Sequence, residues 1–310
     1  MADELIAYLN GEFLPISQCR VPISDRGFGG DSVYDVERTF NGKIFRFEAH
    51  LDRLYRSLKY VRIDPRMTKQ EMADITREVV RRNEHLRGDG DWSVNQTITR
   101  GVPLGNTTGR TSSVVDDVPP TVFINVYAPP FKRYAHLHDV GIHAIIPRVR
   151  NYHPDTIDNK AKHRSRLNLT MAQLEVVEAD PEAWPLLLDH YGNISEGTGS
   201  NFYIVTDGVL RTPTDTSILQ GMSRDTVMML AKDLGIPLVE EDIQPFDAYT
   251  ADEAFMTGTS HSMLPISRID WRPIGDEMPG PIVRQLLAAW SEMAGLDIVD
   301  QAKAQAAHTD

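Results

Sequence analysis

The most constraining feature of the sequence is a polar, glycine-containing segment, residues 189–201, between two apolar runs. One run, residues 184–188, precedes it, and the other, residues 202–205, follows it. Short apolar runs bounded by turn residues predict buried strands. The chain is therefore expected to turn at residues 191–193, which places Glu196 between two buried strands. From this stretch alone, a plain hairpin with an exposed glutamate is an equally good interpretation.

Alternation and turn signals predict strands and helices along the whole chain. Asn10 with Gly11 and Asn41 with Gly42 predict tight hairpins, and residues 32–40 alternate as a strand with polar groups on both faces. One face of that strand carries Val33, Asp35, Glu37 and Thr39, and the other carries Tyr34, Val36, Arg38 and Phe40. Further strands are expected at residues 92–99, 121–127, 140–147, 238–243, 253–256 and 263–269. Helices are expected at residues 48–60, 69–86, 164–179, 227–234 and 281–294, with Ser223 as a plausible N-cap before the fourth.

The length of 310 residues predicts roughly two domains of about 150 residues each. The best linker candidate is residues 128–135, because two adjacent prolines stop both a helix and a strand ladder. We therefore expect a small N-terminal α/β domain over residues 1–127 and a larger C-terminal domain over residues 136–310.

The net charge of −12 argues against a protein that binds nucleic acid or anionic membranes without specificity. Cys19 is the only cysteine, so an intrachain disulfide is impossible and a reducing compartment is expected. The acidic start differs from a secretory signal, and no apolar run approaches the roughly 18 residues of a membrane span. The sequence thus predicts a cytoplasmic protein with no membrane partner.

Three motifs together identify a family. They are Ile-Ser-Glu-Gly-Thr-Gly-Ser-Asn at residues 194–201, Gln-Gly-Met-Ser-Arg-Asp at residues 220–225, and His-Leu-Asp-Arg-Leu at residues 50–54. With these motifs the chain resembles the class IV, fold-type IV pyridoxal-phosphate aminotransferases over nearly its whole length. That group holds branched-chain and D-amino-acid aminotransferases, (R)-selective amine transaminases and aminodeoxychorismate lyase. The resemblance implies pyridoxal 5'-phosphate as the cofactor and two α/β domains, the C-terminal one a pseudo-barrel, with the cofactor in the cleft between them.

The resemblance also requires a lysine about 33 residues before Glu196 to form a Schiff base with the cofactor. Lys162 lies 34 residues upstream and directly precedes the expected helix, which favours it, while Lys160 stays an alternative. Burial beside a cationic ring lowers the pKa of such a lysine, so that its neutral amine can attack and then move protons. A chain that kept the fold without the cofactor is disfavoured, because both Lys162 and Glu196 are present.

The remaining site residues follow from the resemblance. Glu196 is expected at the ring nitrogen, where it keeps the ring protonated as an electron sink. The phosphate is expected to bind Arg53, Met222, Ser223 and Thr259. Arg166 stands near the place of a family tyrosine that contacts the ring hydroxyl, although this departure leaves the contact open. No metal ion is expected in the site.

For the substrate, residues 30–36 and 97–101 look more like the D-amino-acid and (R)-amine branch. The resemblance then assigns the substrate carboxylate to Arg100, with residues 101–119 as a loop that swings, although Arg100 could simply end an exposed strand. The other residues expected in the substrate pocket are Tyr34, Arg38 and Ser260. Arg38 could point into that pocket beside Tyr34, where two arginines would suit dicarboxylates, or pair with a nearby acid.

We therefore expect a ping-pong transaminase that moves an amino group from a D-amino acid or (R)-primary amine to pyruvate or 2-oxoglutarate. The alternative is a branched-chain L-amino-acid aminotransferase, and a lyase such as aminodeoxychorismate lyase ranks below both. The fold type further implies a homodimer or higher homo-oligomer in which neighbouring subunits complete each pocket.

Overall fold

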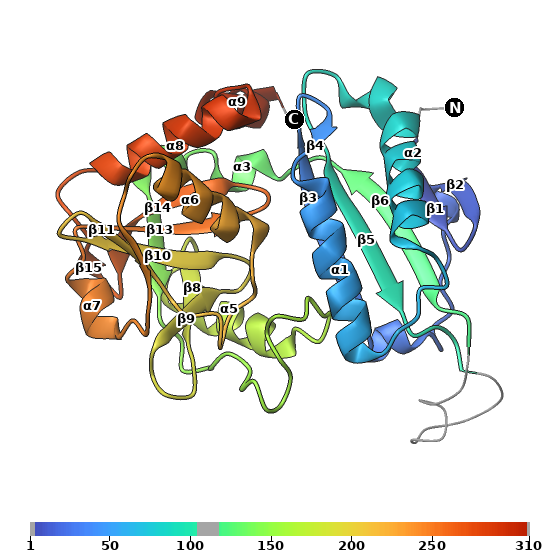
Figure 1. Cartoon of the computed structure of the whole chain (residues 1–310), viewed down its shortest axis with the longest axis horizontal. Coiled ribbons are helices and arrows are strands. Elements are labelled where there is room, and N and C mark those ends of the chain that lie inside the picture. The colour runs from blue at the N-terminus through green and yellow to red at the C-terminus, as the bar shows by residue number, and fades with distance from the viewer. Residues whose placement is uncertain (1–3, 104–117, 309–310) are drawn as a thin grey trace. The chain divides into compact units, whose positions relative to one another are not determined.

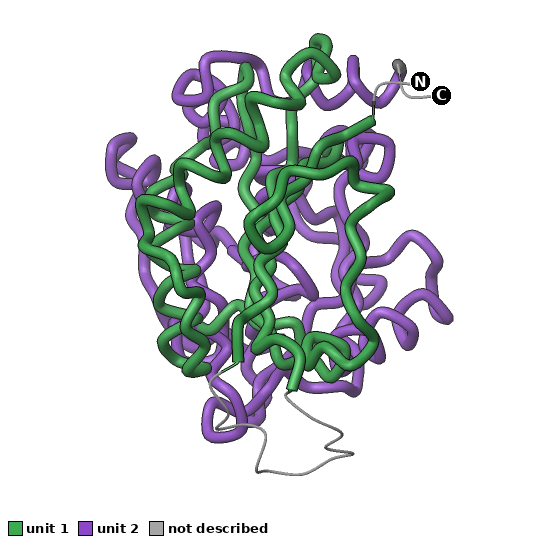
Figure 2. The backbone as a smooth tube through the Cα atoms, turned by 90° about the vertical axis from the view of Figure 1, so that its right-hand side faces the viewer, with its two compact units in different colours: residues 1–129, 161–166 green, residues 130–160, 167–310 purple. Residues whose placement is uncertain are grey.

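The structure is a computed structural model that describes residues 4–103 and 118–308 (Figure 1). The chain forms two compact units (Figure 2). Unit 1 comprises residues 1–129 and 161–166, and unit 2 comprises residues 130–160 and 167–310. The sequence did not indicate that residues 161–166 belong with the N-terminal part. The domain limits expected from the sequence stay a prediction. The compact units show how the chain packs and do not show which parts of it fold independently.

Unit 1 contains an antiparallel sheet with the strand order β2-β1-β6-β5-β3-β4. Its strands are β1 (Ile6–Leu9), β2 (Glu12–Pro15), β3 (Ser32–Phe40), β4 (Lys43–Ile44), β5 (Ser93–Thr99) and β6 (Thr121–Tyr127). Two short 3₁₀ turns, Ile16–Gln18 and Arg26–Gly29, lie between β2 and β3. Both Asn-Gly hairpins are confirmed, with positive φ at all four turn residues, the backbone that this pair favours in a tight hairpin.

Two helices cover one face of this sheet, α1 (Phe47–Val61) and α2 (Lys69–Arg87) (Figure 1). Helix α2 begins with a capping box, in which Thr68 and Glu71 each bond the backbone of the other. The core contains Leu51 and Leu54 of α1, Val79 of α2 and Ile98 of β5. The alternation predicted for β3 is also confirmed. Val33 and Asp35 were expected on the same face of β3, and both lie on the side of the helices, because Val33 is part of this core and Asp35 bonds to a side chain of α1.

Residues 161–166 run beside β3 as an extended segment. The backbone N–H of Tyr34 donates to the carbonyl of Lys162 at 3.0 Å, and that of Arg164 donates to the carbonyl of Ser32 at 3.0 Å. The helix predicted from residue 164 therefore begins only at Leu167, because the preceding backbone is paired with a strand. This pairing places the predicted lysine on the sheet of unit 1.

Unit 2 is built on a nine-stranded sheet with the order β12-β11-β10-β13-β14-β7-β8-β9 and β15 paired to β14. Its strands are β7 (Ile142–Ile145), β8 (Trp184–Leu188), β9 (Ile194–Gly197), β10 (Asn201–Thr206), β11 (Val209–Thr212), β12 (Leu238–Glu240), β13 (Glu253–Gly258), β14 (Ser262–Ile269) and β15 (Arg272–Pro273). Strand β9 also pairs with β10, so the path from β10 through β13, β14, β7 and β8 returns to its start. This closed path is the pseudo-barrel, and closure leaves those strands few free edges.

The helices of unit 2 surround this sheet. They are α3 (Phe131–Tyr134), α4 (Leu137–Val140), α5 (Leu167–Ala179), α6 (Met222–Asp233), α7 (Pro245–Tyr249), α8 (Pro281–Ala294) and α9 (Ile298–His308). The predicted linker thus contains the short helix α3. Helix α6 starts five residues earlier than predicted and its N-cap is Gly221, so Ser223 is not the cap but lies in the first turn. Within the described ranges, none of the helices is both long and apolar enough to cross a membrane.

Candidate active site

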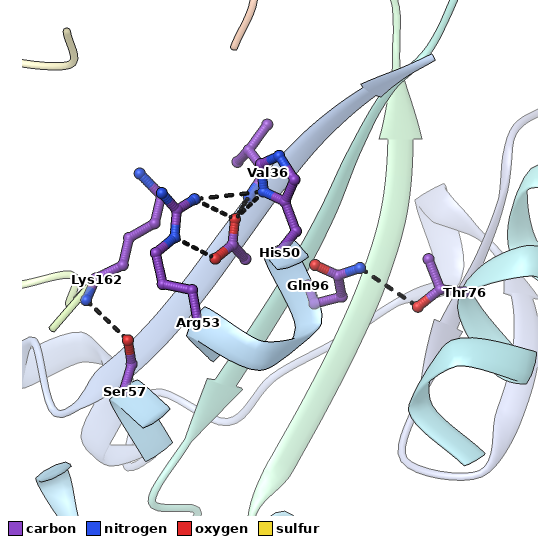
Figure 3. Close-up of polar contacts among 8 residues, drawn as sticks. Val36, His50, Arg53, Ser57, Thr76, Gln96 and Lys162 are labelled. Atoms are coloured by element: carbon purple, nitrogen blue, oxygen red, sulfur yellow. Dashed lines mark hydrogen bonds and ion pairs between the residues drawn. The ribbon is translucent and has the colours of Figure 1, made fainter. Parts of the chain in front are cut away.

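Helix α1 presents a buried arginine and a buried histidine to Asp35 of β3. The Arg53 guanidinium donates from Nε to Asp35 Oδ2 at 2.9 Å and from Nη2 to Oδ1 at 2.7 Å. His50 Nδ1 lies 2.8 Å from the same Oδ1. His50 and Arg53 are three residues apart, so both side chains leave the same face of the helix (Figure 3). The two-pronged contact fixes the orientation of the guanidinium.

Charges in this cluster shift several pKa values. Burial alone would raise the pKa of Asp35, but Arg53 and His50 outweigh it and hold that pKa well below its usual range. Burial, and then the Asp35 charge, raise the pKa of Glu37 well above its usual range. Glu37 is fully buried on the same face of β3. We therefore expect Glu37 to be protonated and Asp35 to carry the negative charge opposite Arg53.

Asp35, Glu37 and His50 also bring their potential metal-ligand atoms within 4.8 Å of one another. The Arg53 guanidinium already provides the cation for Asp35. A metal ion there would have to lie against that guanidinium, so the electrostatics disfavour a metal site.

Lys162 is held by its backbone. Its N–H donates to Ser57 Oγ on α1 at 3.0 Å, and Ser57 follows Arg53 by one helical turn (Figure 3). The Nζ atom lies 4.8 Å from the centre of the Tyr34 ring. Burial lowers the pKa of the Lys162 amine, which favours the neutral form that a nucleophilic lysine needs. Lys160, by contrast, lies 3.5 Å from Asp158 and is 39% exposed.

Tyr34 lies among three cationic side chains from residues 161–166. Arg166 donates from Nη1 to the Tyr34 hydroxyl at 3.0 Å, and the Arg164 guanidinium carbon lies 3.9 Å from the ring centre. Burial alone would raise the pKa of Tyr34, but Lys162, Arg166 and Arg164 together lower it. Of the residues predicted for the site, Lys162, Tyr34 and Arg166 are thus in contact in unit 1.

Two other predicted arginines are engaged in different contacts. Arg38 is buried and its guanidinium lies 4.4 Å from the ring centre of Phe40. Arg100 donates to Asp31 at 2.7 Å and to the carbonyls of Val61 and Arg62, at 2.7 and 2.8 Å. Its role with a substrate carboxylate stays a prediction. The swinging loop predicted for residues 101–119 falls mostly outside the described residues.

In unit 2 the carboxylate of Glu196 is bound by neutral donors. Oε2 accepts from Asn201 Nδ2 at 3.1 Å and from the backbone N–H of Leu219 at 3.0 Å, and Oε1 accepts from Asn151 Nδ2 at 3.2 Å. Glu196 and Asn201 are paired residues of β9 and β10, and Asn201 is paired with Thr257 of β13. Paired residues point to the same side of a sheet, so these three side chains share one face.

The start of α6 approaches this face. A side chain at Gly221 would overlap Asn201 Oδ1, so glycine permits the close approach. Among the described residues no side chain caps α6, and the N–H groups of the first helical turn, which contains Ser223, are groups that can bind an anion. Thr259 and Ser260 follow β13, and the Ser260 carbonyl accepts from the Tyr134 hydroxyl at 2.6 Å.

Each unit contains groups that suit pyridoxal phosphate. In unit 1 the buried Arg53 is a cation suited to a phosphate, and Lys162 is an amine with a lowered pKa. In unit 2 the uncapped helix start suits a phosphate, and buried Thr257 Oγ1 has no hydrogen-bond partner among the described residues. The side chains and backbone groups of both units therefore fit this cofactor.

Several residues at these positions were missed by sequence reasoning. Ser57 and Asn151 are neutral residues whose partners lie 105 and 45 positions away, so no local pattern marks them. Asp35 is a charged residue in a strand that the sequence predicts. A buried charge needs a partner of opposite sign, and this requirement could have pointed to Arg53.

Comparison with known proteins identifies the family. The family model for amino-transferase class IV matches residues 32–269. A putative branched-chain-amino-acid aminotransferase of Methanocaldococcus jannaschii is 36% identical over 301 residues, covering 95% of this chain and 99% of that protein. A D-alanine aminotransferase of Staphylococcus aureus is 31% identical over 284 residues, covering 90% and 94%.

Solved structures agree. The branched-chain amino acid aminotransferase of T.th., complexed with N-(5'-phosphopyridoxyl)-L-glutamate, superposes with a TM-score of 0.82 at 28% identity, covering 95% of this chain and 96% of that one. The fold is thus fold type IV, and the expected α/β class is confirmed. The cofactor is pyridoxal phosphate, and the substrates are amino acids and 2-oxo acids. The chain belongs to the class IV aminotransferases.

Proposed function

We propose that this aminotransferase transfers the amino group of a branched-chain L-amino acid to a 2-oxo acid by two ping-pong half-reactions. The observation that carries the proposal is the 36% identity with the Methanocaldococcus jannaschii protein over 301 residues of both chains. Similar solved structures are also branched-chain aminotransferases. The order of the two candidates is therefore the reverse of the one expected from sequence.

The second candidate is transfer from a D-amino acid or an (R)-amine. It is favoured by the D-alanine aminotransferases, which are 30–31% identical over 90% of the chain. Residues 30–36 and 97–101 favour the same branch. In the structure residues 30–36 form the end of the loop before β3 and the first part of β3. Residues 97–101 form the last part of β5 and the two residues after it.

Unit 1 supplies the proton-transfer group. When bound, pyridoxal phosphate supplies an electron sink for the negative charge that develops at the substrate carbon. We assign the transfer of the proton at that carbon to Lys162 Nζ, because burial lowers the pKa of this amine and favours its neutral form. Ser57 orients Lys162 through its backbone N–H. In unit 2 the carboxylate of Glu196 would hold a proton at the ring nitrogen.

Each unit offers its own groups to a phosphate. Arg53 of unit 1 offers a cation whose orientation Asp35 fixes. In unit 2 the N–H groups of Met222 and Ser223 and the hydroxyl of Thr259 are the proposed donors. Because the family resemblance includes pockets completed by a neighbouring subunit, we also propose a homodimer or larger homo-oligomer.

The test is a half-reaction titration of the purified, cofactor-loaded enzyme. Loss of the cofactor absorbance is followed after addition of L-leucine, D-alanine or (R)-1-phenylethylamine separately. L-leucine is expected to bleach the enzyme fastest. Bleaching by D-alanine or the (R)-amine with L-leucine inert would overturn the proposal and establish the second candidate. Light scattering on the same preparation should give the mass of at least two chains, and a single-chain mass would refute the oligomer.

A further inference from the structure

Arg164 is a fixed guanidinium with neutral partners. Its Nη2 donates to Asn95 Oδ1 and to Thr97 Oγ1, both at 3.0 Å. Asn95 is oriented in turn by its amide, which donates to Asn125 Oδ1 at 2.9 Å. The guanidinium lies on the Tyr34 ring, with 3.9 Å between its carbon and the ring centre. These contacts hold the group in place while the other guanidinium nitrogens stay available.

The charge of Arg164 is not neutralised by a carboxylate in the described part of the chain. Arg53 is paired with Asp35, and Arg100 with Asp31. Arg100 also uses its two terminal nitrogens on backbone carbonyls of α1 and its C-cap. Within residues 4–103 and 118–308, Arg164 has neither kind of contact. Of these three arginines, Arg164 alone is positioned by hydrogen bonds to neutral side chains and still lacks an anionic partner.

A cavity of about 370 Å³ adjoins Arg164. It is lined by Val21, Asp25, Gly27, Phe28, Ser32, Thr97, Thr99 and Arg164. Asp25 is the only acid among these lining residues, and its two oxygens already accept from Thr99 and Thr121 and from the N–H of Gly27. Val21 and Phe28 add exposed apolar surface. The cavity therefore suits a ligand with an anionic group and an apolar part.

Arg164 also lies near the predicted reaction centre. Lys162 Nζ and the Arg164 guanidinium carbon lie 4.8 and 3.9 Å from the centre of one ring, that of Tyr34. The two cationic groups are therefore within about 9 Å of each other, the largest separation that these two distances allow. That upper limit is within the span of one small molecule, and of the two cationic groups Arg164 is the one that lines the cavity.

We propose that Arg164 binds a carboxylate of the substrate, both in the amino acid donor and in the 2-oxo acid acceptor, and thereby selects carboxylates over plain amines. The inference rests on the proposed transaminase function and assigns to Arg164 the role that sequence reasoning gave to Arg100. A guanidinium binds a carboxylate through two parallel hydrogen bonds. A site built for this pairing binds poorly any ligand that lacks the charge, because the cation then stays unpaired.

The experiment compares matched ligands on the cofactor-loaded enzyme. Dissociation constants are measured by calorimetry for 4-methylpentanoate and its neutral amide, and half-reaction rates for L-leucine and 3-methylbutylamine, which lacks only the carboxylate. Arg164 is exposed, so in Arg164→Gln the preference for the charged member of each pair should fall about 10-fold, the effect of one hydrogen bond to a charged group. Arg164→Lys should recover part of it. Arg148→Gln, which replaces an arginine that is 93% exposed, is the control and should leave both preferences unchanged.

The outcomes separate the two proposals. If wild-type enzyme reacts with D-alanine and not with L-leucine, the proposed substrate fails, and the same comparison is run with D-alanine and ethylamine. Rates with 2-oxoglutarate and 4-methyl-2-oxopentanoate then show which carboxylate Arg164 binds. A loss for both is expected, because each carries a carboxylate beside the reacting carbon, as L-leucine does. A loss confined to 2-oxoglutarate would assign Arg164 to the distal carboxylate and contradict the inference. An unchanged preference in Arg164→Gln, with normal cofactor absorbance, would overturn the inference, as would an equal loss for charged and uncharged ligands.

Discussion

Asp35 in unit 1 and Glu196 in unit 2 are carboxylates on strands near residues assigned to the cofactor, yet different groups bind them. Asp35 is fully buried and lies against Arg53 and His50, at 2.7 to 2.9 Å. Glu196 is only partly buried and accepts hydrogen bonds from two amide side chains and one backbone N–H.

This difference predicts different sensitivity to substitution. Removing one partner of a buried ion pair leaves a buried charge without compensation. The free-energy cost of that charge is far larger than the stabilisation that the intact pair provides. Removing one neutral donor from a carboxylate that keeps other donors costs about one hydrogen bond. Unit 1 should therefore depend on every member of its cluster, whereas unit 2 should tolerate single changes.

The largest effect is expected for Asp35→Asn. Arg53 would keep its charge without a partner, so the free energy of unfolding should fall by about 3–5 kcal/mol. Denaturant unfolding of the cofactor-free protein measures this loss. A titration with pyridoxal phosphate should show weaker binding as well, since Arg53 loses its orientation. A change below about 1 kcal/mol would contradict the role given to the ion pair.

The matched change in unit 2 is Asn201→Ala, which removes one donor from Glu196. The free energy of unfolding should fall by about 1–3 kcal/mol, the cost of one hydrogen bond to a charged group. The same denaturant experiment applies. If this loss equals that of Asp35→Asn, the distinction between the two units is broken.

A smaller, pH-dependent effect is expected for Glu37→Gln. Because the pKa of Glu37 is raised in the folded protein, the native state holds a proton that the unfolded state loses above about pH 4.3. Between that pH and the raised pKa, stability should fall as pH rises, by about 1.4 kcal/mol per pH unit. Glu37→Gln should remove this slope in unfolding measured at pH 5, 6 and 7. The lowered pKa of Asp35 has the opposite effect, because the stability that the ionised Asp35 gives the folded protein is lost only as pH falls. Parallel pH profiles for variant and wild type would show that Glu37 is ionised in the native state.

Local signals explain how much of the fold was predictable. Both Asn-Gly hairpins, β3 and α1 follow from turn chemistry and periodicity within about 15 residues of sequence. The extended course of residues 161–166 does not, because its pairing with β3 involves residues about 130 positions away. Closure of the barrel between β9 and β10 is likewise a tertiary property.

The site shows the same limit. Spacing from Glu196 selected Lys162, which the structure places in contact with Tyr34. The sequence assigned the substrate carboxylate to Arg100 and could not show that this arginine contacts Asp31 and carbonyls at the end of α1. Ser223 was a plausible N-cap by residue type, yet Gly221 takes that position where the chain passes close to Asn201.

The most direct test of the account is to find the lysine that holds the cofactor. Reduction of the loaded enzyme with sodium borohydride fixes the cofactor covalently, and digestion with mass spectrometry locates it. The account predicts the added mass on Lys162, which burial and Ser57 prepare for that role. Its appearance on Lys160, beside Asp158, would contradict the assignment of the reaction centre to Lys162.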